Sequence, residues 1–257
     1  MVLSHPPVLL SGGNAVGRKE GEGPIGSSFD LISQDDRFGQ KSWEKAESEM
    51  QRLALSSALE KAGLDRSAVE LLLAGDLLNQ CIASGFSARD TGLPFLGLYG
   101  ACSTMGEGLL LASLLLDGGF CSLAAAVTSS HFCTAERQYR TPLHYGGQRS
   151  PTAQWTATAA GAVLLAREGQ GPRVTACTVG KVVDKGISDP ANMGAAMAPV
   201  DVKLAPHPEE TRQYKIQLFS TKYVLFPGGD VIFRINSNFR YVEPEFVKRP
   251  FKCKSCA

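Results

Sequence analysis

YGACST, residues 99–104, joins two apolar stretches of the chain. Residues 93–99 before it have the length of a strand, and residues 105–116 after it have the length of a buried helix. In that arrangement Cys102 lies in a tight turn at a helix N-terminus, where unpaired backbone N–H groups favour a thiolate or a bound anion. The stretch therefore predicts a strand–turn–helix unit with a cysteine at its centre.

Strand-like and helix-like segments alternate on both sides of this unit. An amphipathic helix is expected from Ser42, a typical N-cap residue, to Gly63, a typical stop signal. The other expected segments are strands near residues 8–10, 71–75 and 123–128, a helix over 77–89, a hairpin-like pair of strands over 157–167 and 173–183, and an irregular surface segment over 11–40. This alternation predicts a layered α/β fold with a mostly parallel sheet and a buried central helix.

Three polar side chains follow consecutive predicted strands. They are Asp76, Cys102 and His131. Ligands of parallel sheets bind beyond the carboxyl ends of the strands, so this placement predicts that all three are ligand-binding residues. Each also has an ordinary structural explanation: Asp76 as a helix cap, Cys102 as a small buried thiol, and His131 as a hydrogen-bonded histidine at a strand end.

Composition narrows the class of protein. The 257 residues are 44% hydrophobic and 20% charged, as in an ordinary soluble globular protein, and the net charge of +1 gives no basis for a nucleic-acid partner. No apolar run reaches the roughly 18 residues of a membrane span, and the N-terminus lacks the features of a signal peptide. The seven scattered cysteines favour reduced thiols in an intracellular setting.

The composition changes after Pro199, where the chain becomes richer in aromatic and basic residues. We therefore divide the chain into residues 1–199 and a tail, residues 200–257. Residues 223–225 and 231–233 are typical of a β-hairpin, so the tail is expected to be β-rich. Cys253 and Cys256 form a lone C-x-x-C pair near the terminus, which is weak support for zinc, and we expect no metal site.

Residues 1–198 resemble the stage V sporulation protein AD family, thiolase-like proteins of endospore-forming bacteria. The matching motifs are FGQKSWE at 38–44, LAGDLLNQ at 73–80, GACST at 100–104, TSSH at 128–131, TAERQYR at 134–140, YGGQ at 145–148, TVGKV at 178–182 and SDP at 188–190. They are spread along the whole of this part of the chain.

The resemblance implies a thiolase-like fold, in which one chain contains two similar β-α-β halves. It also implies that two such chains form a homodimer. It also implies binding of dipicolinic acid (pyridine-2,6-dicarboxylate), alone or as its calcium chelate, and transport of that ligand into the developing spore, with a link to spore germination. The implied partners are membrane proteins of the same sporulation operon, which would place the chain inside the sporulating cell, peripheral at the spore inner membrane. Asp76, Cys102 and His131 match positions that the family associates with its ligand pocket.

The resemblance ends near Pro199, so the second half-domain, from which thiolase-fold enzymes draw catalytic His or Asn residues, is expected to be absent. We accordingly expect no catalytic residue, no cofactor and no enzymatic activity. Two alternatives stay open. One is a thiolase-class acyltransferase with Cys102 as nucleophile and His131 as base. The other is a truncated, non-functional product.

Overall fold

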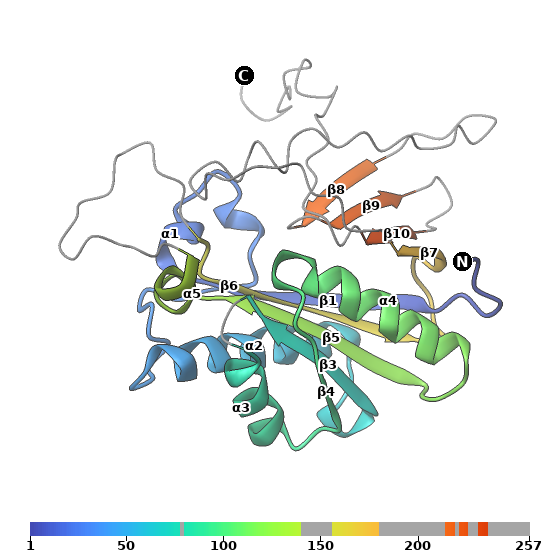
Figure 1. Cartoon of the computed structure of the whole chain (residues 1–257), viewed down its shortest axis with the longest axis horizontal. Helices are drawn as coiled ribbons and strands as arrows, with labels where there is room; N and C mark the ends of the chain where they lie inside the picture. The colour runs from blue at the N-terminus through green and yellow to red at the C-terminus, as the bar shows by residue number, and fades with distance from the viewer. Residues whose placement is uncertain (78–79, 140–155, 180–213, 219–220, 226–230, 236–257) are drawn as a thin grey trace, which may run out of the picture.

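The structure is a computed structural model, and it describes residues 1–77, 80–139, 156–179, 214–218, 221–225 and 231–235. A six-stranded sheet forms the middle layer. Two helices, α2 (Trp43–Ala62) and α3 (Ile82–Thr91), cover one face of it, and α4 (Thr104–Asp117) covers the other (Figure 1). Each helical layer packs its own apolar cluster against the sheet.

The strands of the main sheet lie in the spatial order β2 (Leu31–Ile32), β1 (Val8–Val16), β6 (Ala159–Ala166), β5 (Leu123–Ser130), β3 (Leu71–Asp76) and β4 (Phe95–Gly97). β6 is antiparallel to both of its neighbours, and the other three pairings are parallel. Five strands therefore run in one direction and β6 alone opposes them. The predicted layered α/β class with a mostly parallel sheet is confirmed.

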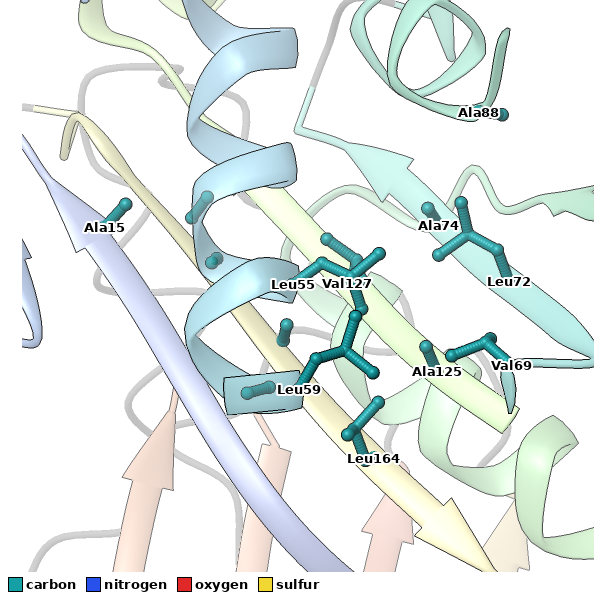
Figure 2. Close-up of a cluster of buried hydrophobic side chains, with 14 of the residues drawn as sticks. Ala15, Leu55, Leu59, Val69, Leu72, Ala74, Ala88, Ala125, Val127 and Leu164 are labelled. Atoms are coloured by element: carbon teal, nitrogen blue, oxygen red, sulfur yellow. The ribbon is translucent and has the colours of Figure 1, made fainter. Parts of the chain in front are cut away.

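Helix α2 begins and ends where the sequence predicts. The Ser42 hydroxyl accepts a hydrogen bond from the Lys45 backbone N–H at 3.3 Å, and Gly63 ends the helix in the left-handed conformation with φ 65°. Its buried residues recur at helical spacing and pack against β1, β5 and β6. Figure 2 shows this cluster, in which Leu55 and Leu59 of α2 face Val127 and Leu164 of the sheet.

Helix α4 is the predicted buried central helix. Leu109 and Leu116 are buried in the apolar cluster that also contains Leu73 of β3 and Leu165 of β6. On its other side α4 contacts β10 (Val231–Ile235), a strand of a second sheet. The helix therefore has sheet residues on two sides, which agrees with its nearly continuous apolar sequence.

The second sheet contains strands from the predicted β-rich tail. Its order is β7 (Val174–Val179), β10, β9 (Thr221–Leu225) and β8 (Tyr214–Leu218). β9 and β10 are antiparallel partners, as the hairpin prediction requires. The connecting residues 226–230 and the predicted boundary at Pro199 lie outside the described residues.

Four sequence expectations need correction. β1 continues through Val16, and the segment predicted to be irregular also contains α1 (Arg18–Gly21), the 3₁₀ turn η1 (Gly26–Ser28) and β2. The predicted pair of strands over 157–167 and 173–183 is not a hairpin, because β6 and β7 belong to different sheets. β4 is shorter than the apolar run that contains it. Helix α3 begins at Ile82 instead of residue 77, because Gln80 and Cys81 have positive φ angles.

Three short elements complete the described part: the 3₁₀ turns η2 (Arg66–Ala68) and η3 (Ala101–Ser103), and helix α5 (Phe132–Tyr139) after β5. Within the residues that the structure describes, no helix is both long enough and apolar enough to cross a membrane.

Candidate functional site

Asp76, the last residue of β3, is completely buried. Its Oδ1 accepts a hydrogen bond from the Cys81 backbone N–H at 3.2 Å. Its Oδ2 accepts from the backbone N–H and the hydroxyl of Ser84, at 3.2 and 3.0 Å. The Cys81 side chain makes no cap bond at the start of α3, so Asp76 supplies the acceptor for these donors. Asp76 therefore caps the N-terminus of α3, which is the structural explanation that the sequence also allowed.

Cys102 is half-buried in η3, directly before α4, as the strand–turn–helix prediction requires. Two hydroxyls close the turn. Ser103 Oγ donates to the Gly100 carbonyl at 2.6 Å, and Thr104 Oγ1 donates to the Ala101 carbonyl at 2.7 Å. Ala101 adopts a φ of 47°, which a non-glycine residue rarely does. The Ser103 side chain makes no cap hydrogen bond at the N-terminus of α4.

Glu107 is a neighbour of this turn that the sequence analysis missed. A Cβ atom on Gly100 would lie 2.7 Å from Glu107 Oε2, so the carboxyl group lies against the Gly100 backbone. Burial raises the pKa of Glu107, which makes the carboxyl group easier to protonate. Its position in the first turn of α4, five residues after Cys102, is the signal that could have identified it.

Cys81 is the second thiol near this turn. It follows the end of β3, and its Sγ donates to the Leu98 carbonyl at 3.1 Å. Burial raises the pKa of the Cys81 thiol, and the negative charges of Asp76 and Glu107 raise it further. A thiolate is therefore disfavoured at Cys81, and the thiol acts as a hydrogen-bond donor.

His131 follows β5 and is completely buried. Its Nδ1 accepts from the Cys133 backbone N–H at 3.1 Å, so the proton of the neutral ring is on Nε2 and is donated to the Asp36 carbonyl at 2.8 Å. The ring centroid lies 5.3 Å from that of Trp43, and the Arg37 guanidinium lies over the Trp43 ring. Burial lowers the pKa of His131, although Asp36, Glu20 and Glu44 act in the opposite direction.

The three predicted site residues divide between the two faces of the sheet. Asp76 contacts Ser84 of α3, and His131 contacts Trp43 at the start of α2, so both lie on the face that α2 and α3 cover. Cys102 precedes α4, which covers the opposite face. All three follow neighbouring parallel strands, as expected from the sequence. Their contact with a ligand stays a prediction.

Asp76 and the end of β5 are linked by buried polar side chains of α2 that the sequence analysis also missed. We call this group the α2 network, and it consists of Glu47, Gln51, Ser84, Ser129 and Thr134, together with Asp76. Within the described residues, no three His, Cys, Asp or Glu side chains are grouped so that they could hold a metal ion.

Comparison with known proteins assigns the family. The family model described as Stage V sporulation protein AD matches residues 1–223. Stage V sporulation protein AD of Bacillus subtilis is 48% identical over 198 residues, which are 77% of this chain and 59% of that protein. The chain therefore spans about three fifths of the length of this curated relative.

Several solved structures are similar to part of this chain. The crystal structure of 3-oxoacyl-[acyl-carrier-protein] synthase III from Aquifex aeolicus has a TM-score of 0.43 at 15% identity and covers 64% of this chain and 55% of its own. A variant of OleA from Xanthomonas campestris has a TM-score of 0.44 at 16% identity and covers 65% of this chain and 57% of its own. On the family model, which matches most of the sequence, the chain belongs to the stage V sporulation protein AD family.

Proposed function

We propose that this chain binds dipicolinic acid, alone or as its calcium chelate, for uptake into the developing spore. The observation that carries the proposal is the start of α4 beside Cys102. This helix of 14 residues begins at a half-buried turn, and the Ser103 side chain does not cap it. The positive end of the helix dipole favours a carboxylate at this position.

The surroundings of the turn agree with an anionic ligand. The Glu107 carboxyl group lies against Gly100, and burial raises the pKa of Glu107. The raised pKa makes Glu107 easier to protonate, and protonation would weaken its repulsion of a dicarboxylate.

Asp76 and His131 would act from the face of the sheet that α2 and α3 cover, opposite to α4. Asp76 already accepts from Cys81 and Ser84, so it would orient the start of α3 or share an oxygen with a bound calcium ion. His131 carries its proton on Nε2, where the Asp36 carbonyl accepts it. Contact between His131 and the ligand therefore requires that this bond be exchanged for one to a ligand carboxylate.

The same geometry argues against the acyltransferase alternative. A base for Cys102 needs a free lone pair, but the Nδ1 lone pair of His131 accepts from Cys133 and its Nε2 carries the proton. Incubation with acyl-coenzyme A followed by mass spectrometry tests this point. We expect no thioester on Cys102. A stoichiometric thioester would refute the binding function and support the acyltransferase alternative.

The cellular setting follows from the same proposal. We propose that the chain acts inside the sporulating cell, peripheral at the spore inner membrane, with membrane proteins of its sporulation operon as partners. We also propose a homodimer. β4 is an edge strand of the main sheet, and Phe95 and Leu96 are 38% and 43% exposed there, so a second copy could cover this edge.

Calorimetry with dipicolinate, in the presence and absence of calcium, tests the binding function. We expect saturable binding by the wild-type chain and at least tenfold weaker binding by Cys102→Ala, about 1.4 kcal/mol. Cys121→Ala is the matched control, because Cys121 is buried beyond the other end of α4. The absence of binding by a cooperatively folded wild-type chain would refute the proposal. A broad melting transition would instead support the alternative of a non-functional product.

A further inference from the structure

Helix α2 places two polar residues on its buried face, one helical turn apart. Glu47 is 1% exposed and Gln51 is 0% exposed. Burial of a carboxylate or an amide is unfavourable unless hydrogen bonds replace those to water. Both residues lie at the level where β3 and β5 end, next to Asp76 and His131. Their partners therefore show which parts of the candidate site they hold.

Glu47 holds the segment on either side of His131. Its Oε1 accepts from the Ser129 hydroxyl at 2.9 Å, and its Oε2 accepts from the Thr134 hydroxyl at 2.8 Å. Thr134 Oγ1 also lies 2.9 Å from the His131 carbonyl. One carboxylate thus joins the end of strand β5 to the first turn of helix α5, with His131 between its two partners.

Gln51 connects this segment to Asp76. Its Nε2 lies 3.0 Å from Ser84 Oγ and 2.8 Å from Ser129 Oγ, with the Gly75 carbonyl oxygen farther away at 3.3 Å. Each serine has one hydroxyl proton, and Ser84 gives its proton to Asp76 while Ser129 gives its proton to Glu47. Both hydroxyl oxygens must therefore accept from Gln51, whose amide group supplies two protons.

The orientation of the Gln51 amide supports the assignment of Gln51 as the donor to both serines, because this orientation leaves one buried oxygen unsatisfied. Its Oε1 is buried and has no hydrogen-bond partner among the described residues. Rotation of the amide by 180° would place Oε1 between two hydroxyl groups whose protons are already donated to carboxylates. The observed orientation keeps both donated bonds and leaves one acceptor unsatisfied, which buried polar groups rarely do without a reason.

We propose that Glu47 and Gln51 are positioning residues, which hold Asp76 and the His131 segment at a fixed separation for the ligand. Neither residue is proposed to touch the ligand. The inference rests on the proposed dipicolinate site for its ligand. The hydrogen bonds that it describes are present without any ligand, so the positioning role can be measured separately.

The first test compares substitutions by dipicolinate calorimetry on the full chain. Gln51→Met keeps the side-chain volume and removes both donors, and we expect it to weaken binding about tenfold. Leu55→Met is the matched control one turn later on the buried face of α2, and it should bind as the wild type does. Glu47→Met should also weaken binding. Glu47→Gln should restore it, because a glutamine can accept from Ser129 and donate to Thr134.

The second test needs no ligand. Amide hydrogen exchange measured by NMR reports the Cys81 and Ser84 N–H groups, which donate to Asp76. In Gln51→Met we expect both to exchange about tenfold faster, because the Ser84 hydroxyl loses the Gln51 donor that holds it beside Asp76. Amides near Leu59 should keep their wild-type rates. In Leu55→Met, the Cys81 and Ser84 rates should not change.

The two tests separate the two proposals. If the wild-type chain binds no dipicolinate but Gln51→Met exposes the Cys81 and Ser84 amides, the ligand is wrong and the positioning role stands. Wild-type exchange rates in Gln51→Met would overturn the positioning role, and so would a loss of binding in Leu55→Met equal to that in Gln51→Met. If Gln51→Met does not fold, Glu47→Gln and Glu47→Met decide by the same two measurements.

Discussion

His131 donates its Nε2 proton to the backbone carbonyl of Asp36, which lies 95 residues earlier in the chain, at 2.8 Å. The bond ties the end of β5 to the loop that leads into α2. The same ring accepts the Cys133 backbone N–H at Nδ1. Only the neutral ring can make both bonds, because a protonated ring has no acceptor. The Nδ1 bond to Cys133 therefore depends on pH, whereas the Nε2 bond to Asp36 does not.

The first prediction concerns that dependence. Burial lowers the pKa of His131 from its ordinary value of 6.5, so the unfolded chain takes up a proton at a higher pH than the folded chain does. The contribution of the neutral ring is present above pH 6.5 and is lost as the pH falls toward the lower pKa of the folded state. Thermal melts between pH 5 and 8, at roughly half-unit steps, should show a falling Tm on the acid side.

His131→Gln supplies the comparison for this experiment. Glutamine keeps a donor for the Asp36 carbonyl and has no titratable group, so its melting profile should be flatter below pH 6.5. His5→Gln is the control: the His5 side chain is 69% exposed and lies 3.7 Å from Asp117, an exposed pair of little stabilising value, so this variant should keep most of the slope on the acid side. Equal slopes in wild type and His131→Gln would show that other groups cause the dependence.

The second prediction uses two adjacent glycines of β1. A Cβ atom on Gly13 would overlap the backbone of Ala54 and Ala58 in α2, whereas one on Gly12 would make an ordinary contact, 3.5 Å from the Ala162 carbonyl oxygen. We expect Gly13→Ala to lower the free energy of unfolding by about 2 kcal/mol or more, because backbone atoms cannot move aside easily. Urea unfolding measures it. Gly12→Ala should change it by less than about 1 kcal/mol.

These glycines also show where sequence reasoning ended. Periodicity and caps located α2, and the apolar runs located β3, β5 and α4, because those signals are local. In the sequence, Gly12 and Gly13 favour an irregular segment. Nothing in the local sequence shows that α2 packs closely on β1 at Gly13. The pairing of β7 with β10 could not be predicted for the same reason, because strand pairing is a long-range property.

The candidate site follows the same division. Strand ends predicted the places of Asp76, Cys102 and His131, because a strand end can be located from the sequence. Glu47 and Gln51 were missed because polar residues one turn apart on an amphipathic helix usually face solvent. The partners of Glu47 are Ser129 and Thr134, 82 and 87 residues away in the chain, so local sequence could not show that this part of α2 is buried.

The third prediction tests the proposed homodimer. Leu96 is the middle residue of the edge strand β4 and is 43% exposed. A lysine at an edge strand opposes pairing with a second copy, so Leu96→Lys should convert a dimer into a monomer in analytical ultracentrifugation. Ile25→Lys is the control, because Ile25 is exposed in the segment between α1 and η1. A monomeric wild-type chain would contradict the proposed dimer.

The last prediction concerns the turn beside Cys102. A Cβ atom on Gly100 would lie 2.7 Å from both Glu107 Oε2 and Ser103 Oγ, which are the ends of side chains that can move. We therefore expect Gly100→Ala to fold with a Tm close to that of the wild type. The Glu107 carboxyl group and the Ser103 hydroxyl would shift at the N-terminus of α4, where we place a ligand carboxylate, so dipicolinate affinity should fall about fivefold to tenfold.

Gly85→Ala in α3 is the control for this substitution. Nothing lies within 4 Å of a Cβ atom at Gly85, and alanine in a helix interior stabilises by about 0.5–1 kcal/mol, so this variant should melt slightly higher and bind as the wild type does. If Gly100→Ala kept full affinity while retaining the fold, the carboxylate would have to bind away from the Gly100 turn. The start of α4 would then lose its place as the anion site, and Asp76 would remain as the better candidate through a calcium ion.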